Sequence, residues 1–140
     1  MLNLDPNTEF GARVARRLSE EIMIWLTTVR ASGTPDPSPV WFLWDGEALL
    51  IFSKPNTQKL RNIADNPIVA LNFDGNGSGG DIIVITGTAR IDEQAPPVHQ
   101  MPAYATKYAA KIQGMGMTAE QFGRAYSVAI RVTPASVRGH

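Results

Sequence analysis

Residues 51–67, IFSKPNTQKLRNIADNP, decide the fold and the site that we expect in this chain. An apolar strand ends at Ser53 and Lys54, a Pro-Asn turn follows, and a short basic helix begins at once. Backbone N–H groups at a helix start lack intrahelical partners, and the helix dipole adds partial positive charge there. Because Lys54, Lys59 and Arg61 add whole charges, the segment predicts a phosphate-type anion site. The alternative is a surface helix whose basic side chains only face water.

Runs of β-branched and aromatic residues lie on both sides of this segment and predict strands. The expected strands cover residues 22–29, 37–44, 48–53, 68–73, 81–90 and 127–133. Asp45-Gly46 predicts a two-residue turn before the third strand, and Pro134 is expected to stop the last one. Short hairpin connections favour an antiparallel sheet that closes on itself. The expected fold class is therefore mainly β, a small barrel with flanking helices.

Three or four helices are expected around this sheet. Apolar residues four apart predict an N-terminal helix over 10–18, and helical spacing after Pro96-Pro97 predicts another up to about Lys111. Thr118 with Gln121 indicates a capping box for a short further helix. With no repeat and no long linker, residues 1–140 are expected to form one domain.

Composition excludes several classes of function. The 140 residues include 13 basic and 13 acidic ones, so no net field attracts nucleic acid or an anionic membrane. Cysteine is absent, which removes thiolate chemistry and agrees with a reducing compartment. Neither a signal peptide nor a membrane-spanning run is recognisable, so we expect a cytoplasmic protein.

The segment GNGSGG at residues 75–80 satisfies the dinucleotide-binding pattern G-x-G-x-x-G. That pattern requires a helix directly after the loop, because the pyrophosphate sits on the helix N-terminus. Here the strand sequence DIIVITG follows instead. We therefore interpret the loop as a hairpin connection.

Catalytic side chains and metal ligands are few. His99 follows two prolines and His140 is the last residue, and neither has an evident partner for nucleophilic catalysis. No His spacing or carboxylate cluster predicts a metal site. If the protein is an enzyme, a bound organic cofactor is expected to supply the chemistry.

Aromatic residues concentrate in the predicted strands. Trp25, Trp41 and Trp44 lie there, and Trp41 and Phe42 must point to opposite faces of a strand. Core or dimer packing explains most of them, but one or two are suited to form the wall of a flat heteroaromatic pocket. So many aromatics in a small sheet also predict a homodimer.

Two segments together carry a family resemblance: TVRASGTPDPSPVWFLWDG at residues 28–46 and LLIFSKPNTQKLRNIADNPIVALNF at residues 49–73. They resemble the pyridoxamine-phosphate-oxidase-like, FMN-binding split β-barrel superfamily. Within it they resemble the branch of oxidoreductases that depend on the deazaflavin coenzyme F-420. The resemblance extends over residues 22–133 and implies a homodimer with cofactor sites at the subunit interface.

The resemblance also implies which residues contact the cofactor. The strand Ser38-Pro39-Val40-Trp41 would lie along the ring, with Phe52 and Ser53 on the next strand. The family's phosphate clamp corresponds to Thr57-Gln58-Lys59, and Lys54, Lys59 and Arg61 would hold the phosphate and the anionic tail of F-420. Asp81 and Ile82 of a second copy would complete each pocket. Gln58 and Ser38 stand where FMN-binding relatives carry arginine, which favours F-420 over FMN.

The expected function is transfer of a hydride from reduced F-420 to an unidentified small organic acceptor. One alternative is an FMN flavoprotein, and another is a non-catalytic protein that binds deazaflavin or a tetrapyrrole such as haem or biliverdin. The histidines disfavour haem. No catalytic residue is identified, although Tyr104, Tyr108 and Tyr126 are chemically able to donate a proton.

Overall fold

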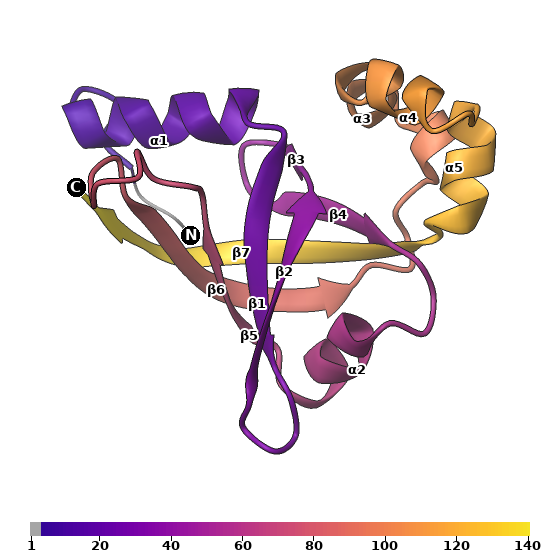
Figure 1. The fold of residues 1–140 in the computed structure, drawn as a ribbon, viewed down its shortest axis with the longest axis horizontal. Coiled ribbons are helices and arrows are strands. Elements are labelled where there is room, and N and C mark those ends of the chain that lie inside the picture. The colour runs from indigo at the N-terminus through magenta and orange to yellow at the C-terminus, as the bar shows by residue number, and fades with distance from the viewer. Residues whose placement is uncertain (1–3) are drawn as a thin grey trace.

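The computed structural model describes residues 4–140 (Figure 1). The strands are β1 (Met23–Val29), β2 (Pro35–Trp41), β3 (Leu43–Trp44), β4 (Leu49–Ser53), β5 (Ile68–Asn72), β6 (Ile83–Ile91) and β7 (Val128–Gly139). The helices are α1 (Glu9–Glu20), α2 (Gln58–Asp65), α3 (Pro102–Lys107), α4 (Ala109–Gly114) and α5 (Ala119–Ala125), with a 3₁₀ turn η1 (Val98–Gln100).

The seven strands form one antiparallel sheet in the order β2-β1-β5-β6-β7-β4-β3. The two edge strands, β2 and β3, are separated in sequence by Phe42 alone. A sheet whose opposite edges are joined by one residue must curl until those edges meet. The predicted mainly β fold with an antiparallel, curled sheet and flanking helices is confirmed.

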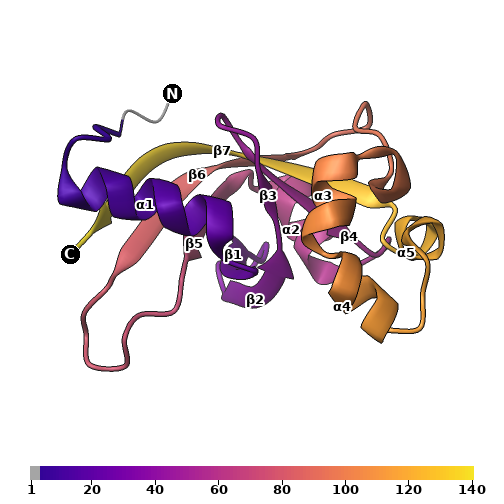
Figure 2. The same cartoon turned by 90° about the horizontal axis from the view of Figure 1, so that it is seen from above.

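Apolar side chains form two cores on opposite faces of the curled sheet. The first fills the inside of the half-barrel and includes Leu49 and Ile51, while the second lies between the outer face and α3–α5 and includes Leu50 and Phe52. Every residue of β4 is buried because β4 serves both cores. Figures 1 and 2 show α3–α5 as a separate helical layer at the β4 side, with α1 at the other end. Phe42 packs in the first core and Trp41 against the second, as the strand alternation predicted.

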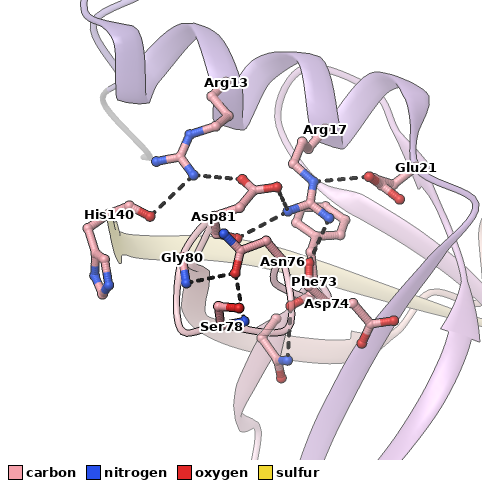
Figure 3. A network of polar contacts seen from close by, with 11 residues as sticks. Arg13, Arg17, Glu21, Phe73, Asp74, Asn76, Ser78, Gly80, Asp81 and His140 are labelled. Carbon is pink, nitrogen blue, oxygen red and sulfur yellow. Dashed lines mark hydrogen bonds and ion pairs between the residues drawn. The ribbon is translucent and has the colours of Figure 1, made fainter.

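Helix α1 is tied to the β5–β6 connection by ion pairs (Figure 3). The Asp81 carboxylate lies 2.7 Å from Arg13 Nη1 and 3.1 Å from Arg17 Nη1. In the glycine-rich loop, the Asn76 side chain accepts hydrogen bonds from the N–H groups of Ser78 and Gly80. The loop is therefore a hairpin connection, as the sequence predicted, and a strand follows it.

The last strand differs from the prediction because it continues through Pro134 to Gly139. The register between β6 and β7 shifts at this point. Gly87 pairs with Pro134, whereas the preceding residue, Thr86, pairs with Ser136. This bulge accommodates the proline, which has no N–H to donate. Gly87 allows the close approach, because a Cβ there would lie 2.3 Å from the Thr133 carbonyl oxygen.

Three other predicted boundaries were wrong. The strand expected at residues 37–44 divides at Phe42, which gives seven strands in place of six. The two turn residues are Gly46 and Glu47, one position later than expected, because the Asp45 N–H bonds the Ala48 carbonyl at 3.1 Å and the Asp45 carboxylate accepts from the N–H groups of Glu47 and Ala48. The helix that follows the prolines breaks at Tyr108 into α3 and α4.

The predicted capping box of α5 is confirmed, with reciprocal bonds between Thr118 and Gln121. None of the helices between residues 4 and 140 is long and apolar enough to span a membrane.

Candidate functional site

A cavity of about 350 Å³ lies between the outer face of the sheet and the helical layer. Its walls come from β2, the end of β4, the start of α2 and the α3–α5 region. The residues that line it are Pro39, Val40, Trp41, Phe52, Ser53, Lys54, Thr57, Lys59, Tyr104, Met115, Phe122 and Tyr126. The cavity therefore combines residues distant in sequence, with the phosphate-site segment at one side.

One side of the cavity is a wall of stacked aromatic rings. The Trp41 ring is nearly parallel to Tyr108 at 4.6 Å and to Phe122 at 5.5 Å between centroids. Phe122 stacks in turn on Tyr126 at 4.3 Å. Stacked rings cover part of one another's faces, and Trp41, Phe122 and Tyr126 of this stack line the cavity, so the wall here is apolar and aromatic, as sites for heteroaromatic ligands commonly are.

The opposite side is polar and contains the start of α2. Thr57 is the N-cap residue, yet its side chain makes no capping bond and lies 3.1 Å from the Ser53 hydroxyl. The first N–H groups of a helix have no intrahelical acceptors, so donors cluster here with two hydroxyls. Lys59 is half-buried beside them and lines the cavity. Burial lowers the pKa of Lys59, and the negative charge of Asp36 opposes that shift. A partly desolvated ammonium next to free donors favours a bound anion.

A chain of side-chain hydrogen bonds fixes α2 on the sheet. The buried Asn62 donates to the Thr28 hydroxyl at 2.9 Å and to the Asp36 carboxylate at 3.3 Å. Gln58 Nε2 donates to the side-chain oxygen Oδ1 of Asn62 at 2.8 Å, and Arg61 donates to Gln58 Oε1 at 2.9 Å. This network orients the helix start, and it also occupies the side chains of Gln58 and Arg61.

The structure brings eight of the twelve predicted cofactor-contact residues to the cavity wall, and Ser38, Gln58, Arg61 and Ile82 are the four that do not line it. Residues of β2 from both faces line the cavity, namely Pro39, Val40 and Trp41, so the cavity meets the end of β2 and Ser38 lies just before that end. Ile82 precedes β6 and pairs through its backbone with His140, near the C-terminus and away from the helical layer.

Four lining residues were absent from the predicted set: Tyr104, Met115, Phe122 and Tyr126. They belong to the helical region, where the spacing predicted helices without indicating which face meets the sheet. Two of the three tyrosines considered as proton donors, Tyr104 and Tyr126, thus line the cavity. The third, Tyr108, is structural, because its hydroxyl accepts from the Phe42 N–H at 2.8 Å and donates to the Ile22 carbonyl at 2.6 Å.

Two lysines near the cavity differ in role. Lys54 is exposed and lies over the Tyr126 ring at 5.4 Å, so it adds positive charge at the cavity rim. Lys107 lies outside the cavity wall and donates to the Phe42 carbonyl at 2.8 Å. Together with Tyr108 it satisfies both backbone polar groups of Phe42, where the sheet edges meet.

Within residues 4–140, no group of three or more His, Cys, Asp and Glu side chains is placed to hold a metal ion.

A family model described as pyridoxamine 5'-phosphate oxidase matches residues 10–140. The chain belongs to this family. No curated protein sequence matches it as a relative. Among solved structures, a Listeria innocua protein named as a pyridoxamine 5'-phosphate oxidase is 21% identical with a TM-score of 0.69, covering 93% of this chain and 97% of that one.

Two further solved structures differ in what their names say they do. An F420 reductase is 25% identical with a TM-score of 0.64, and the match covers 88% of this chain and 94% of that one. A heme storage protein from Vibrio cholerae is 15% identical with a TM-score of 0.64, covering 91% and 92% respectively. The split-barrel fold expected from the resemblance is thereby confirmed, and it serves different ligands in different proteins.

Proposed function

We propose that this protein is an oxidoreductase that binds reduced coenzyme F-420 in the cavity and directs its hydride to a small organic acceptor. The observation that carries the proposal is the pairing, in one cavity, of a half-buried lysine at a helix start with a wall of stacked aromatic rings. A phosphate with an anionic tail suits the first feature and a planar ring suits the second. The 25% identity to an F420 reductase is consistent with this ligand.

The residues at the polar side would hold the phosphate. Lys59 supplies the charge, and Ser53, Thr57 and the first N–H groups of α2 supply hydrogen bonds. We expect Lys54, which lies over the Tyr126 ring at the rim, to meet the tail carboxylates. Arg61, for which the sequence suggested the same role, is held by Asn56 and Gln58 and would need to break those bonds to take part.

The residues at the apolar side would orient the ring and exclude water from it. Trp41, Phe52 and Phe122 line the cavity with apolar surface, and Phe52 and Phe122 are buried. Bound reduced deazaflavin supplies the hydride, so the chain contributes orientation and desolvation. A proton for the product comes from solvent or from Tyr126, which is half-buried at the cavity wall.

We also propose that two copies associate, with a cofactor site at each side of the interface. The exposed apolar side chains are consistent with such a contact, since Ile68 is 57% exposed and Met115, which lines the cavity, is 47% exposed. Residues 81 and 82 of a second copy are the proposed additional contacts. Asp81 already pairs with Arg13 and Arg17 of its own chain through its carboxylate, and its carbonyl oxygen accepts from Arg17 Nη1 at 3.3 Å, so it would have to exchange part of this network to contribute.

Parallel titrations of the purified protein with F-420, FMN and haem test the proposed function. We expect F-420 to bind with a change in its fluorescence, and reduced F-420 to be oxidised when a panel of quinones, enones and nitroaromatics is added. Binding of haem alone would support a tetrapyrrole carrier instead, and binding of FMN alone would support a flavoprotein. Either result would refute the F-420 assignment.

A further inference from the structure

Tyr104 and Tyr108 are neighbours in the second core and differ in one respect. Both side chains are 0% exposed, and their ring centroids lie 4.9 Å apart. The Tyr108 hydroxyl bonds to the backbone of Phe42 and Ile22. The Tyr104 hydroxyl has no hydrogen-bond partner anywhere in residues 4–140.

An unpaired hydroxyl in the core is unfavourable, since burying a polar group without a partner costs about 1–3 kcal/mol. Phenylalanine would fill the same space without that loss, so packing alone does not explain a tyrosine here. Burial raises the pKa of Tyr104, and the nearby Tyr108 and Tyr126 raise it further. The hydroxyl therefore stays protonated at physiological pH, and its hydrogen is available to an acceptor.

The position of Tyr104 relates this donor to the cavity. Tyr104 lines the cavity, and its ring packs edge-on against Phe52 at 4.9 Å. Four donors of the cavity wall, Ser53, Lys54, Thr57 and Lys59, come from the β4 and α2 side, and the Tyr126 hydroxyl comes from the end of α5. Tyr104 comes from α3, so a ligand that reached its buried hydroxyl would meet a second donor on the helical side of the cavity.

We propose that Tyr104 is a ligand-binding residue whose hydroxyl donates a hydrogen bond to a carbonyl oxygen or ring nitrogen of the planar heteroaromatic ring in the cavity. This inference rests on the proposed function, because it needs a ring ligand. The hydroxyl is fully buried, so the ligand must displace part of the cavity wall to reach it. Met115, flexible and 47% exposed, belongs to the same wall and is suited to move.

The test uses Tyr104→Phe with Tyr108→Phe as a matched control, because each substitution removes one buried hydroxyl from the same helical segment. Urea unfolding measures the stability of each variant, and fluorescence titration with F-420 measures the dissociation constant. We expect Tyr104→Phe to leave the urea midpoint unchanged or raised and to weaken F-420 binding about 3- to 10-fold, the range for one neutral hydrogen bond. Tyr108→Phe should lower the midpoint, since the Phe42 N–H then loses its partner.

Three outcomes would overturn the inference in distinguishable ways. If wild-type protein binds F-420 and Tyr104→Phe binds it equally well, the hydroxyl is not a ligand contact, while the proposed function stands. If Tyr104→Phe lowers the urea midpoint as much as Tyr108→Phe does, the hydroxyl has a structural partner. If wild-type protein does not bind F-420, the proposed function fails and this inference fails with it.

Discussion

Replacing Lys59 with alanine removes the one half-buried cation of the cavity wall in residues 4–140. Its effect should fall on ligand binding and leave folding unchanged. The nearest negative charge, Asp36, keeps other partners, because Arg30 Nε lies 3.5 Å away and the Asn62 amide lies 3.3 Å away. We therefore expect the free energy of unfolding to change by less than about 0.5 kcal/mol, as for most substitutions away from special features.

The expected loss of affinity follows from the opposite charges of the Lys59 ammonium and the F-420 phosphate. A hydrogen bond to a charged partner contributes about 1.5–3 kcal/mol, which corresponds to a rise in the F-420 dissociation constant of about 10- to 100-fold. The upper part of that range applies if the phosphate contacts the Lys59 ammonium directly. Burial removes part of the water around the ammonium, and this water would otherwise compete with the phosphate.

The assay is a fluorescence titration with F-420, with circular dichroism to verify folding. Lys111→Ala is the matched control, because Lys111 is an exposed lysine on α4 that does not line the cavity. The control should retain wild-type affinity at about 0.1 M salt, where exposed charges further than about 10 Å from the ligand are screened. An unchanged dissociation constant for Lys59→Ala, or an equal loss for both variants, would refute the assignment of Lys59 to the phosphate.

Three further predictions concern stability and assembly. Burial lowers the pKa of Lys107 to about 8, so between about pH 8 and pH 10.5 the unfolded chain binds more protons than the folded protein. The free energy of unfolding should therefore rise over this pH range in the wild type and should not rise in Lys107→Met. Gly87→Ala should lower the urea midpoint by the equivalent of about 1–3 kcal/mol, because the new Cβ would lie 2.3 Å from the Thr133 carbonyl oxygen. An unchanged midpoint would show that the bulge relaxes freely. Light scattering should give about twice the 15.2 kDa chain mass, and a monomer at micromolar concentration would rule out the shared site.

The sheet could be predicted from the sequence because its strands and turns are determined mainly by residues that are close together in the chain. Alternation separates Trp41 from Phe42, and the hydrophobic runs mark most strands to within two residues. Pro134 misled the prediction because proline usually ends a strand, whereas here a bulge opposite Gly87 accommodates it. The bulge depends on a partner strand about 47 residues earlier, which local reasoning does not include.

The candidate site was predictable where one segment builds it. Ser53, Lys54, Thr57 and Lys59 belong to the segment at residues 51–67, and all four line the cavity. Gln58 and Arg61 of that segment do not, because their side chains bond to each other and to Asn62 or Asn56. The helical side of the cavity comes from residues after position 100, and only tertiary packing determines which of their side chains face it.

Competition between F-420 and FMN at two ionic strengths tests the proposed cofactor most directly. The cavity wall contains lysines and no arginine within residues 4–140, so the FMN phosphate would lack bidentate guanidinium contacts. The tail of F-420 adds carboxylates, for which Lys54 at the rim is the proposed partner. We predict that F-420 binds more tightly than FMN at low salt and that the difference narrows as salt screens the tail. Equal or tighter binding of FMN at low salt would contradict the F-420 assignment and favour a flavoprotein.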